Sequence, residues 1–235
     1  MTARPGQLFP PVRSAGGSID IVRTLGADYA WRAAEGSNAL LSPYIGSLAL
    51  SKFGAGQSAP APSAALNGQL SMACAAANLG YGASDGGADA AFSIVTVGVN
   101  ASPGASAGFA ATTAAGFGVN SGVSQFATNS TIFSRRGAPL VDATSVKLTP
   151  YSFVVLTIAN GAGVTGYHSK LTPVSTALAG AVASDSKLIM GLSNAGFGMI
   201  GEWALTAMWR RALSGAEAAL LLAQLGARYG VTIGP

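Results

Sequence analysis

Hydrophobic and polar positions alternate most regularly near the end of the chain. Between residues 201 and 209 the alternation has the period of two that is typical of a β-strand. One face of this predicted strand carries Trp203, Leu205, Ala207 and Trp209, and the other carries Ala204, Thr206 and Met208. Two tryptophans on one face form either part of a core or a sugar-stacking surface, and residue burial habits favour the core.

The spacing then changes to that of a short helix. Ser214 has the side chain of an N-cap, and Glu217 stands three residues later, which is the spacing of a capping box. Gly230 is placed to end the helix in the left-handed conformation. We predict a helix over residues 215–229 whose buried face carries Leu220, Leu221 and Leu225.

Shorter strand patterns occur along the rest of the chain. The clearest is the apolar run over residues 92–99, which is bounded by turn residues. Further strands are predicted at residues 18–25, 29–32, 66–72, 107–119, 123–133, 146–148, 152–158, 164–171 and 187–192. The 32 glycines and 11 prolines favour a turn-rich β-protein over a helical one. We therefore predict an all-β domain over residues 18–235, preceded by an extended, irregular arm over residues 1–17.

The end of the chain resembles a known family. It is similar to the C-terminal signature of concanavalin A-like lectin/glucanase domains, in their laminin-G-like branch, at Gly201, Glu202, Trp203, Arg211, Leu213, Ser214, Glu217, Arg228, Tyr229 and Gly230. Upstream, the family turn prefers Asn-Gly where this chain has Ser169 and Lys170, so that hairpin is expected to differ. The resemblance implies a concanavalin A-like jelly-roll β-sandwich with one short C-terminal helix. It implies a structural role for Glu202, Trp203, Ser214 and Glu217. This fold hosts hydrolases, lectins and structural modules, so it leaves the function open.

Charged residues are scarce. Asp, Glu, Lys and Arg make up 9% of the chain, against roughly 25% in ordinary globular domains. A surface with little charge is suited to being covered by other subunits, which predicts a homo-oligomer of three or more chains. The alternative is a composition biased toward Ala and Gly. The net charge is +4, but the cations are scattered without a basic run, which argues against a nucleic-acid partner. No apolar stretch approaches the roughly 18 residues of a membrane-spanning helix, so no membrane partner is expected.

The acidic residues are too few and too scattered for glucanase chemistry. Those enzymes need two carboxylates close together, and no acidic pair with strand spacing occurs here, although Glu35 and Glu202 could still meet in space. We therefore predict a non-enzymatic protein without catalytic residues. The lone cysteine and the lone His168 leave no set of transition-metal ligands. Calcium would find neighbouring carboxylates only at Asp85 and Asp89, and no cofactor is expected.

A carbohydrate site is the remaining chemical candidate. The resemblance implies that sugars would be held by aromatic rings together with amide or carboxylate side chains. No spacing singles out one group of such residues in the sequence. The candidates of the required types are Tyr151, Tyr167, His168 and Asn194.

The start of the chain bears on where the protein works. It lacks the basic segment and apolar run of a secretory signal, yet a lectin-like protein can leave the cell inside a phage particle. We therefore expect a structural accessory protein of a virion, such as a head decoration, fibre or tail-associated subunit. Its arm over residues 1–17 would dock onto other virion proteins, and one face would bind a host surface glycan. The alternative is a stand-alone carbohydrate-binding module of a bacterial secreted protein, with an extracellular location.

Overall fold

The computed structural model describes most of the chain after its first segment. The described residues are 20–36, 40–53, 59–74, 80–84, 91–101, 107–111, 123–128, 131–136, 140–143, 151–160, 163–177, 187–190 and 200–235. The predicted arm over residues 1–17 and the predicted strand over residues 146–148 lie outside these ranges.

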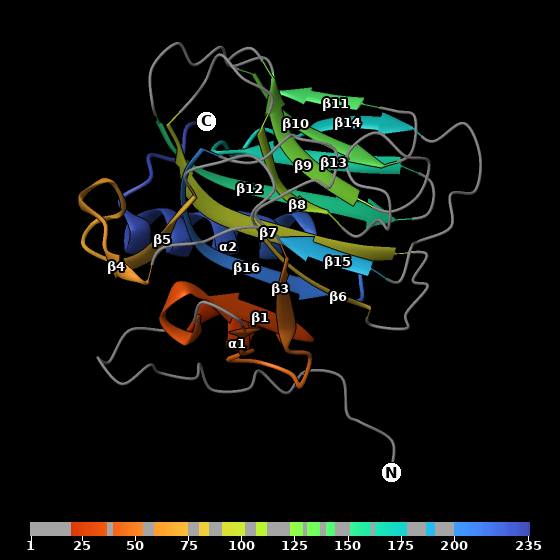
Figure 1. Ribbon diagram of the computed structural model, residues 1–235. Helices are drawn as coiled ribbons and strands as arrows, with labels where there is room; N and C mark the ends of the chain where they lie inside the picture. Colours follow the sequence, from red (N-terminus) through yellow and green to blue (C-terminus); the bar gives the residue numbers. More distant parts are fainter. Residues whose placement is uncertain are drawn as a thin grey trace.

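Two antiparallel sheets lie face to face (Figure 1), and each has eight strands within the described residues. The first sheet has the order β14 (Val174–Ala177), β13 (Gly163–His168), β12 (Tyr151–Asn160), β7 (Ala91–Asn100), β16 (Gly201–Trp209), β5 (Leu70–Cys74) and β4 (Ala61–Pro62), and β1 (Tyr29–Arg32) also pairs with β16. The second sheet has the order β11 (Leu140–Ala143), β10 (Thr131–Arg136), β9 (Val123–Thr128), β8 (Ala107–Ala111), β15 (Lys187–Met190), β6 (Gly80–Ser84), β3 (Leu50–Phe53) and β2 (Leu40–Leu41). The predicted all-β, lectin-like sandwich is confirmed.

The first sheet separates two apolar cores because both of its faces are covered. In the central strand β7, Phe92 and Ile94 point toward the second sheet, whereas Val95 and Val97 point toward the helices. The helices are α1 (Ile21–Thr24) and α2 (Gly215–Tyr229), and the short 3-10 turns are η1 (Ala33–Glu35) and η2 (Ala64–Leu66). A strand that is buried on both faces reads as a continuous apolar run, which is why the pattern over residues 92–99 was clear.

A β-bulge in β16 corrects the predicted facing of the two tryptophans. The pairing register with β7 shifts between Trp203 and Leu205, so Ala204 is the extra residue. One extra residue reverses the facing of everything after it. Trp203 therefore packs between the sheets, while Trp209 packs on the helix side. Both rings are buried, which confirms the core interpretation, but the prediction that they share a face was wrong.

Helix α2 begins and ends where the sequence predicts. Ser214 accepts a hydrogen bond from the backbone of Glu217, and the Glu217 side chain accepts one from the backbone of Ser214. Arg211 also donates to Glu217, and this contact is the main reason that the pKa of the Glu217 carboxyl falls to about 2. Gly230 ends the helix with a φ of 66°. The capping box and its closing glycine are thus confirmed.

The predicted buried face of α2 was wrong at one position. Leu221 and Leu225 are buried as expected, but Leu220 is 47% exposed and Leu222 takes its place in the core. The sequence Leu220-Leu221-Leu222 contains three adjacent leucines, so the pattern alone could not fix the phase of the stripe.

Two early segments also differ from the predicted strands. Residues predicted as a strand over 18–25 contain helix α1, because the Asp20 side chain accepts from the backbone of Arg23 and caps a helical turn. The predicted strand over 66–72 begins only at Leu70, since Asn67 and Gly68 take left-handed backbone conformations. Both segments line a groove beside α2.

Candidate functional site

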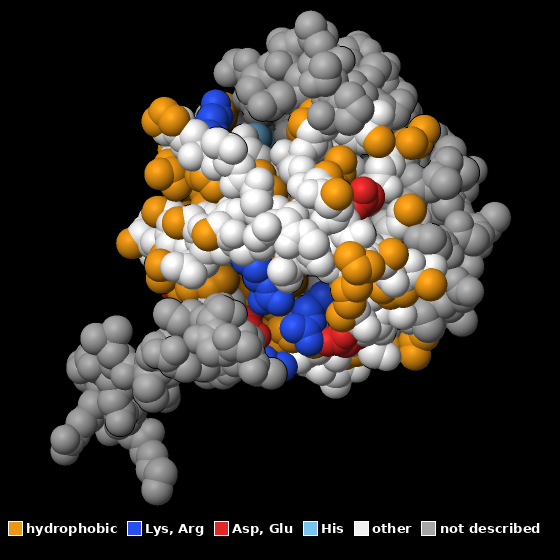
Figure 2. All heavy atoms as spheres, turned by 90° about the vertical axis from the view of Figure 1, so that its left-hand side faces the viewer, with side chains coloured by type: hydrophobic (Ala, Val, Ile, Leu, Met, Phe, Trp, Pro, Cys, Tyr) orange, Lys and Arg blue, Asp and Glu red, His pale blue; other side chains and the backbone are white. Residues whose placement is uncertain are grey.

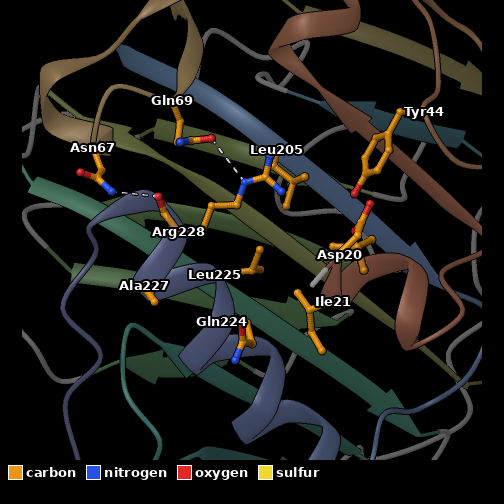
Figure 3. Close-up of a pocket in the computed structure, with 11 residues that line it drawn as sticks. Asp20, Ile21, Tyr44, Asn67, Gln69, Leu205, Gln224, Leu225, Ala227 and Arg228 are labelled. Atoms are coloured by element: carbon orange, nitrogen blue, oxygen red, sulfur yellow. Dashed lines mark hydrogen bonds between the residues drawn. The ribbon is translucent and has the colours of Figure 1, made fainter. Parts of the chain in front are cut away.

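A groove lies on the helix-covered side of the first sheet, between α1, α2 and the segment after η2. Its volume is about 330 Å³, which is at the lower end of the roughly 300–1,000 Å³ range of small-molecule sites. Buried apolar residues lie at its base, and polar side chains surround them (Figure 3). The lining residues of the groove are Asp20, Ile21, Val22, Tyr44, Asn67, Gln69, Leu205, Gln224, Leu225, Ala227 and Arg228.

Arg228 occupies the centre of the groove. Its side chain leaves α2 and extends toward Gln69 (Figure 3), where its Nε donates to the Gln69 Oε1 at 3.3 Å. The Asn67 side chain donates to the Arg228 backbone carbonyl at 3.3 Å. These contacts tie the last turn of α2 to the segment that follows η2. Gln69 thus holds the guanidinium, and Asn67 holds the backbone at the end of α2.

Tyr44 and Asp20 form the opposite wall and point toward one another in Figure 3. Burial raises the pKa of the Tyr44 hydroxyl, and the nearby Asp20 carboxylate raises it further, so the phenol stays neutral. Arg23 and Arg32 lie over the Tyr44 ring, with Cζ at 5.5 Å and 4.3 Å from the ring centroid. Cation–π contacts of this kind fix a ring in orientation. This wall is therefore an aromatic surface supported by two guanidinium groups.

A smaller pocket adjoins the groove on the other side of Arg228. Its volume is about 130 Å³, and Gln69 and Arg228 belong to both linings. Arg32 and Leu70 help to close it. Leu70 is 41% exposed, so the second pocket presents an accessible apolar edge. Gln69 and Arg228 thus stand at the boundary that the two hollows share.

The groove offers hydrogen bonding and an aromatic wall rather than catalytic acids. Among the residues whose side chains the structure describes, five carboxylates each have a polar partner. The pairs are Asp20 with Arg23, Asp28 with the backbone of Arg210, Glu35 with Arg32, Glu202 with Ser71, and Glu217 with Arg211. The described part of the chain holds no cluster of His, Cys, Asp and Glu suited to a metal ion. Asp85 and Asp89 lie outside it.

The structure does not bring the predicted sugar-binding residues together. Tyr167 and His168 are adjacent on β13, so their side chains point to opposite faces of the sheet, and both are buried. Burial lowers the pKa of His168 to about 3, with a smaller contribution from Lys170. Tyr151 is half-buried beside the core between the sheets, where Asn100 donates to its hydroxyl. Asn194 lies outside the described residues.

Sequence reasoning missed the groove because its members come from distant segments. Asp20, Tyr44, Asn67, Gln69 and Gln224 belong to no shared pattern. Arg228 was noticed, but only as part of the family signature. A signal was present at Asn67-Gly68, which marks a turn, and such turns frequently carry polar side chains to a functional surface.

Charged side chains are sparse on the face shown in Figure 2. Several Lys and Arg side chains lie near one another with acidic ones beside them, other charged side chains stand apart, and the rest of the described surface is uncharged or hydrophobic. Within the described residues, no helix combines the length and apolarity that crossing a membrane requires.

No protein-family model and no curated protein matches the chain. Solved structures do match its fold. A Trypanosoma rangeli sialidase in complex with a difluoro sugar acid has a TM-score of 0.62 at 14% identity, over 91% of this chain and 34% of the sialidase chain. The receptor binding domain of botulinum neurotoxin C/D mosaic serotype has a TM-score of 0.57 at 10% identity, over 84% of this chain and 51% of that one. The chain thus spans about a third of the sialidase and about half of the toxin domain. At these identities the likeness establishes a lectin-like β-sandwich fold.

Proposed function

We propose that this chain is a non-enzymatic recognition module that binds a glycan in the groove between α1, α2 and the segment after η2. One observation carries the proposal. Three residues with amide side chains, Asn67, Gln69 and Gln224, line one hollow together with Arg228 and Tyr44. Convergent polar groups over an apolar base are the composition of a small-molecule site.

The chemistry of the groove matches the needs of a sugar. A pyranose presents hydroxyls that require both donors and acceptors, and a side-chain amide supplies one of each. The apolar base of the groove can cover the C–H face of the same sugar. Solved structures that share the fold include a sialidase and a toxin receptor binding domain. Recognition of a surface glycan by this chain is consistent with these structural neighbours.

The paired state of the described carboxylates supports a function without hydrolysis. Glycoside hydrolysis by the usual retaining or inverting mechanism needs two carboxyl groups about 5–10 Å apart, with one available as an acid. In the groove, Asp20 is the carboxylate, and it caps α1 and pairs with Arg23. The groove therefore supports glycan binding without hydrolysis.

The virion setting is proposed on the low charge of the chain, which suits a surface covered by other subunits. In this setting the chain is an accessory subunit that assembles with copies of itself and displays its glycan groove outward. Mass spectrometry of purified phage particles tests the setting. We expect to find the chain in those particles in stoichiometric amounts. Its absence from phage particles produced by the bacterium that encodes the chain would favour the secreted carbohydrate-binding module.

The groove proposal predicts specific losses of affinity. We expect the full chain to bind at least one glycan on an array of bacterial and host surface glycans. For that glycan, Gln69→Ala and Gln224→Ala should each weaken binding about 2- to 10-fold, because each removes one or two hydrogen bonds. Isothermal titration calorimetry measures the change.

Thr172→Ala is the matched control, since Thr172 is exposed and lies outside the groove. Its affinity should equal that of the unaltered chain. The proposal fails if the array shows no binding, or if the two glutamine variants bind as tightly as the Thr172 variant.

A further inference from the structure

Arg228 stands out among the arginines around the groove because no acidic partner for it occurs among the described residues. Arg23 pairs with Asp20 at 3.3 Å, and Arg32 pairs with Glu35. For Arg228 the described contacts are the Gln69 side chain and the Tyr229 ring. Three guanidinium groups thus meet two carboxylates here, and the uncompensated positive charge resides on Arg228.

The orientation of Arg228 leaves its best donors available. Gln69 engages Nε, and within the described part of the chain no hydrogen bond from Nη1 or Nη2 is present. These two nitrogens form the end-on fork of a guanidinium, and its geometry matches the two oxygens of a carboxylate. The anchoring by Gln69 holds the fork in one orientation, which reduces the entropy that a ligand must overcome on binding.

The position of Arg228 strengthens any contact with an anion. The residue is half-buried, and it lies between the groove and the smaller pocket. Partial burial lowers the local dielectric and strengthens a charge–charge contact relative to one in open solvent. The Asp20 carboxylate, which would repel an anion, is paired with Arg23 and caps α1.

We propose that the groove selects a glycan that bears a sugar carboxylate, with the carboxylate bound by the Nη1–Nη2 fork of Arg228. This inference rests on the proposed glycan-binding function and names the ligand class of the same site. A uronic acid and a sialic acid both carry the required group. The neighbouring Gln224 and Asn67 side chains then meet the hydroxyls of the same residue.

Matched ligands separate charge from sugar. The full chain is titrated by calorimetry with a trigalacturonide and with its fully methyl-esterified form, in which each carboxylate is replaced by a neutral methyl ester on the same sugar. A second pair, 3′-sialyllactose and its methyl ester, tests the sialic acid source. In at least one pair we expect the acid to bind about tenfold or more tightly than its neutral partner, as a charged hydrogen-bonded pair provides.

Arg228→Gln should remove this preference, and Arg228→Lys should restore part of it. Lys170→Gln removes one positive charge outside both hollows and should leave the preference intact. Circular dichroism and the thermal midpoint confirm that each variant is folded.

The outcomes distinguish the two proposals. Equal binding of acid and neutral partners, or an equal loss in the Lys170 and Arg228 variants, overturns the carboxylate inference. If the array then shows a neutral glycan bound in the groove, the proposed function stands without it. An array on which nothing binds overturns both.

Discussion

Leu222→Ala is expected to lower the free energy of unfolding by about 2–5 kcal/mol, while Leu220→Ala should change it by less than about 0.5 kcal/mol. Leu222 is fully buried in the core beneath α2, whereas its neighbour two positions earlier is 47% exposed. The two substitutions delete the same atoms from the same helix, so helix propensity cancels between them. Urea denaturation of the full chain measures both values.

The pair decides the phase of α2 on the sheet. If residue 222 lay on the exposed face of the helix instead, the losses of unfolding free energy in the two variants would be reversed. Equal costs would contradict the packing of α2 against the first sheet, because a helix that rests loosely on the surface has no strongly buried side.

Lowering the pH is expected to destabilise the fold already at pH values well above those at which carboxyl groups titrate. The native pKa of His168 is about 3, against an ordinary value of 6.5, because burial penalises the imidazolium and Lys170 adds repulsion. Below pH 6.5 the His168 imidazole therefore binds a proton in the unfolded chain but stays neutral in the native chain. The stability is complete above pH 6.5 and falls as the pH drops toward 3, by about 1.4 kcal/mol per pH unit.

The effect of His168 is best separated from that of other groups between pH 6.5 and 4.5, where the free energy of unfolding is expected to fall by about 2–3 kcal/mol. The second identified group, Glu217, titrates only below its ordinary value of 4.5 and so contributes little there. Urea denaturation at closely spaced pH values gives the slope for the unaltered chain and for His168→Gln. The variant should lack this slope whatever its stability at pH 7. A slope that survives in His168→Gln would contradict the burial of an uncharged imidazole at this position.

Local patterns predicted the elements whose signals are local. The β7 run over residues 92–99 is apolar because both faces of the strand are buried, and α2 carries its own cap and its own closing glycine. The β16 bulge has its signal on another strand. Gly98 faces the backbone of Glu202 so closely that a Cβ would approach its carbonyl oxygen to 2.5 Å. A glycine inside an apolar strand marks such a close approach, but it does not say which neighbour approaches.

The groove could not be predicted for a different reason. Its residues come from five separated segments, namely residues 20–22, 44, 67–69, 205 and 224–228. The helix capped by Asp20 and the left-handed turn at Asn67 bring the first and third of these segments to the end of α2. Both segments look like strands by alternation alone, so the pattern concealed the elements that build the site.

Nuclear magnetic resonance mapping tests the central claim most directly. The uniformly ¹⁵N-labelled chain is titrated with the glycan that binds best on the array, and shifts of backbone and side-chain amides are followed. The account predicts the largest changes at the side-chain amides of Asn67, Gln69 and Gln224 and at the Arg228 Nε–H, with the exposed Thr172 unaffected. Changes centred on another surface, with these groove signals unmoved at saturation, would contradict it.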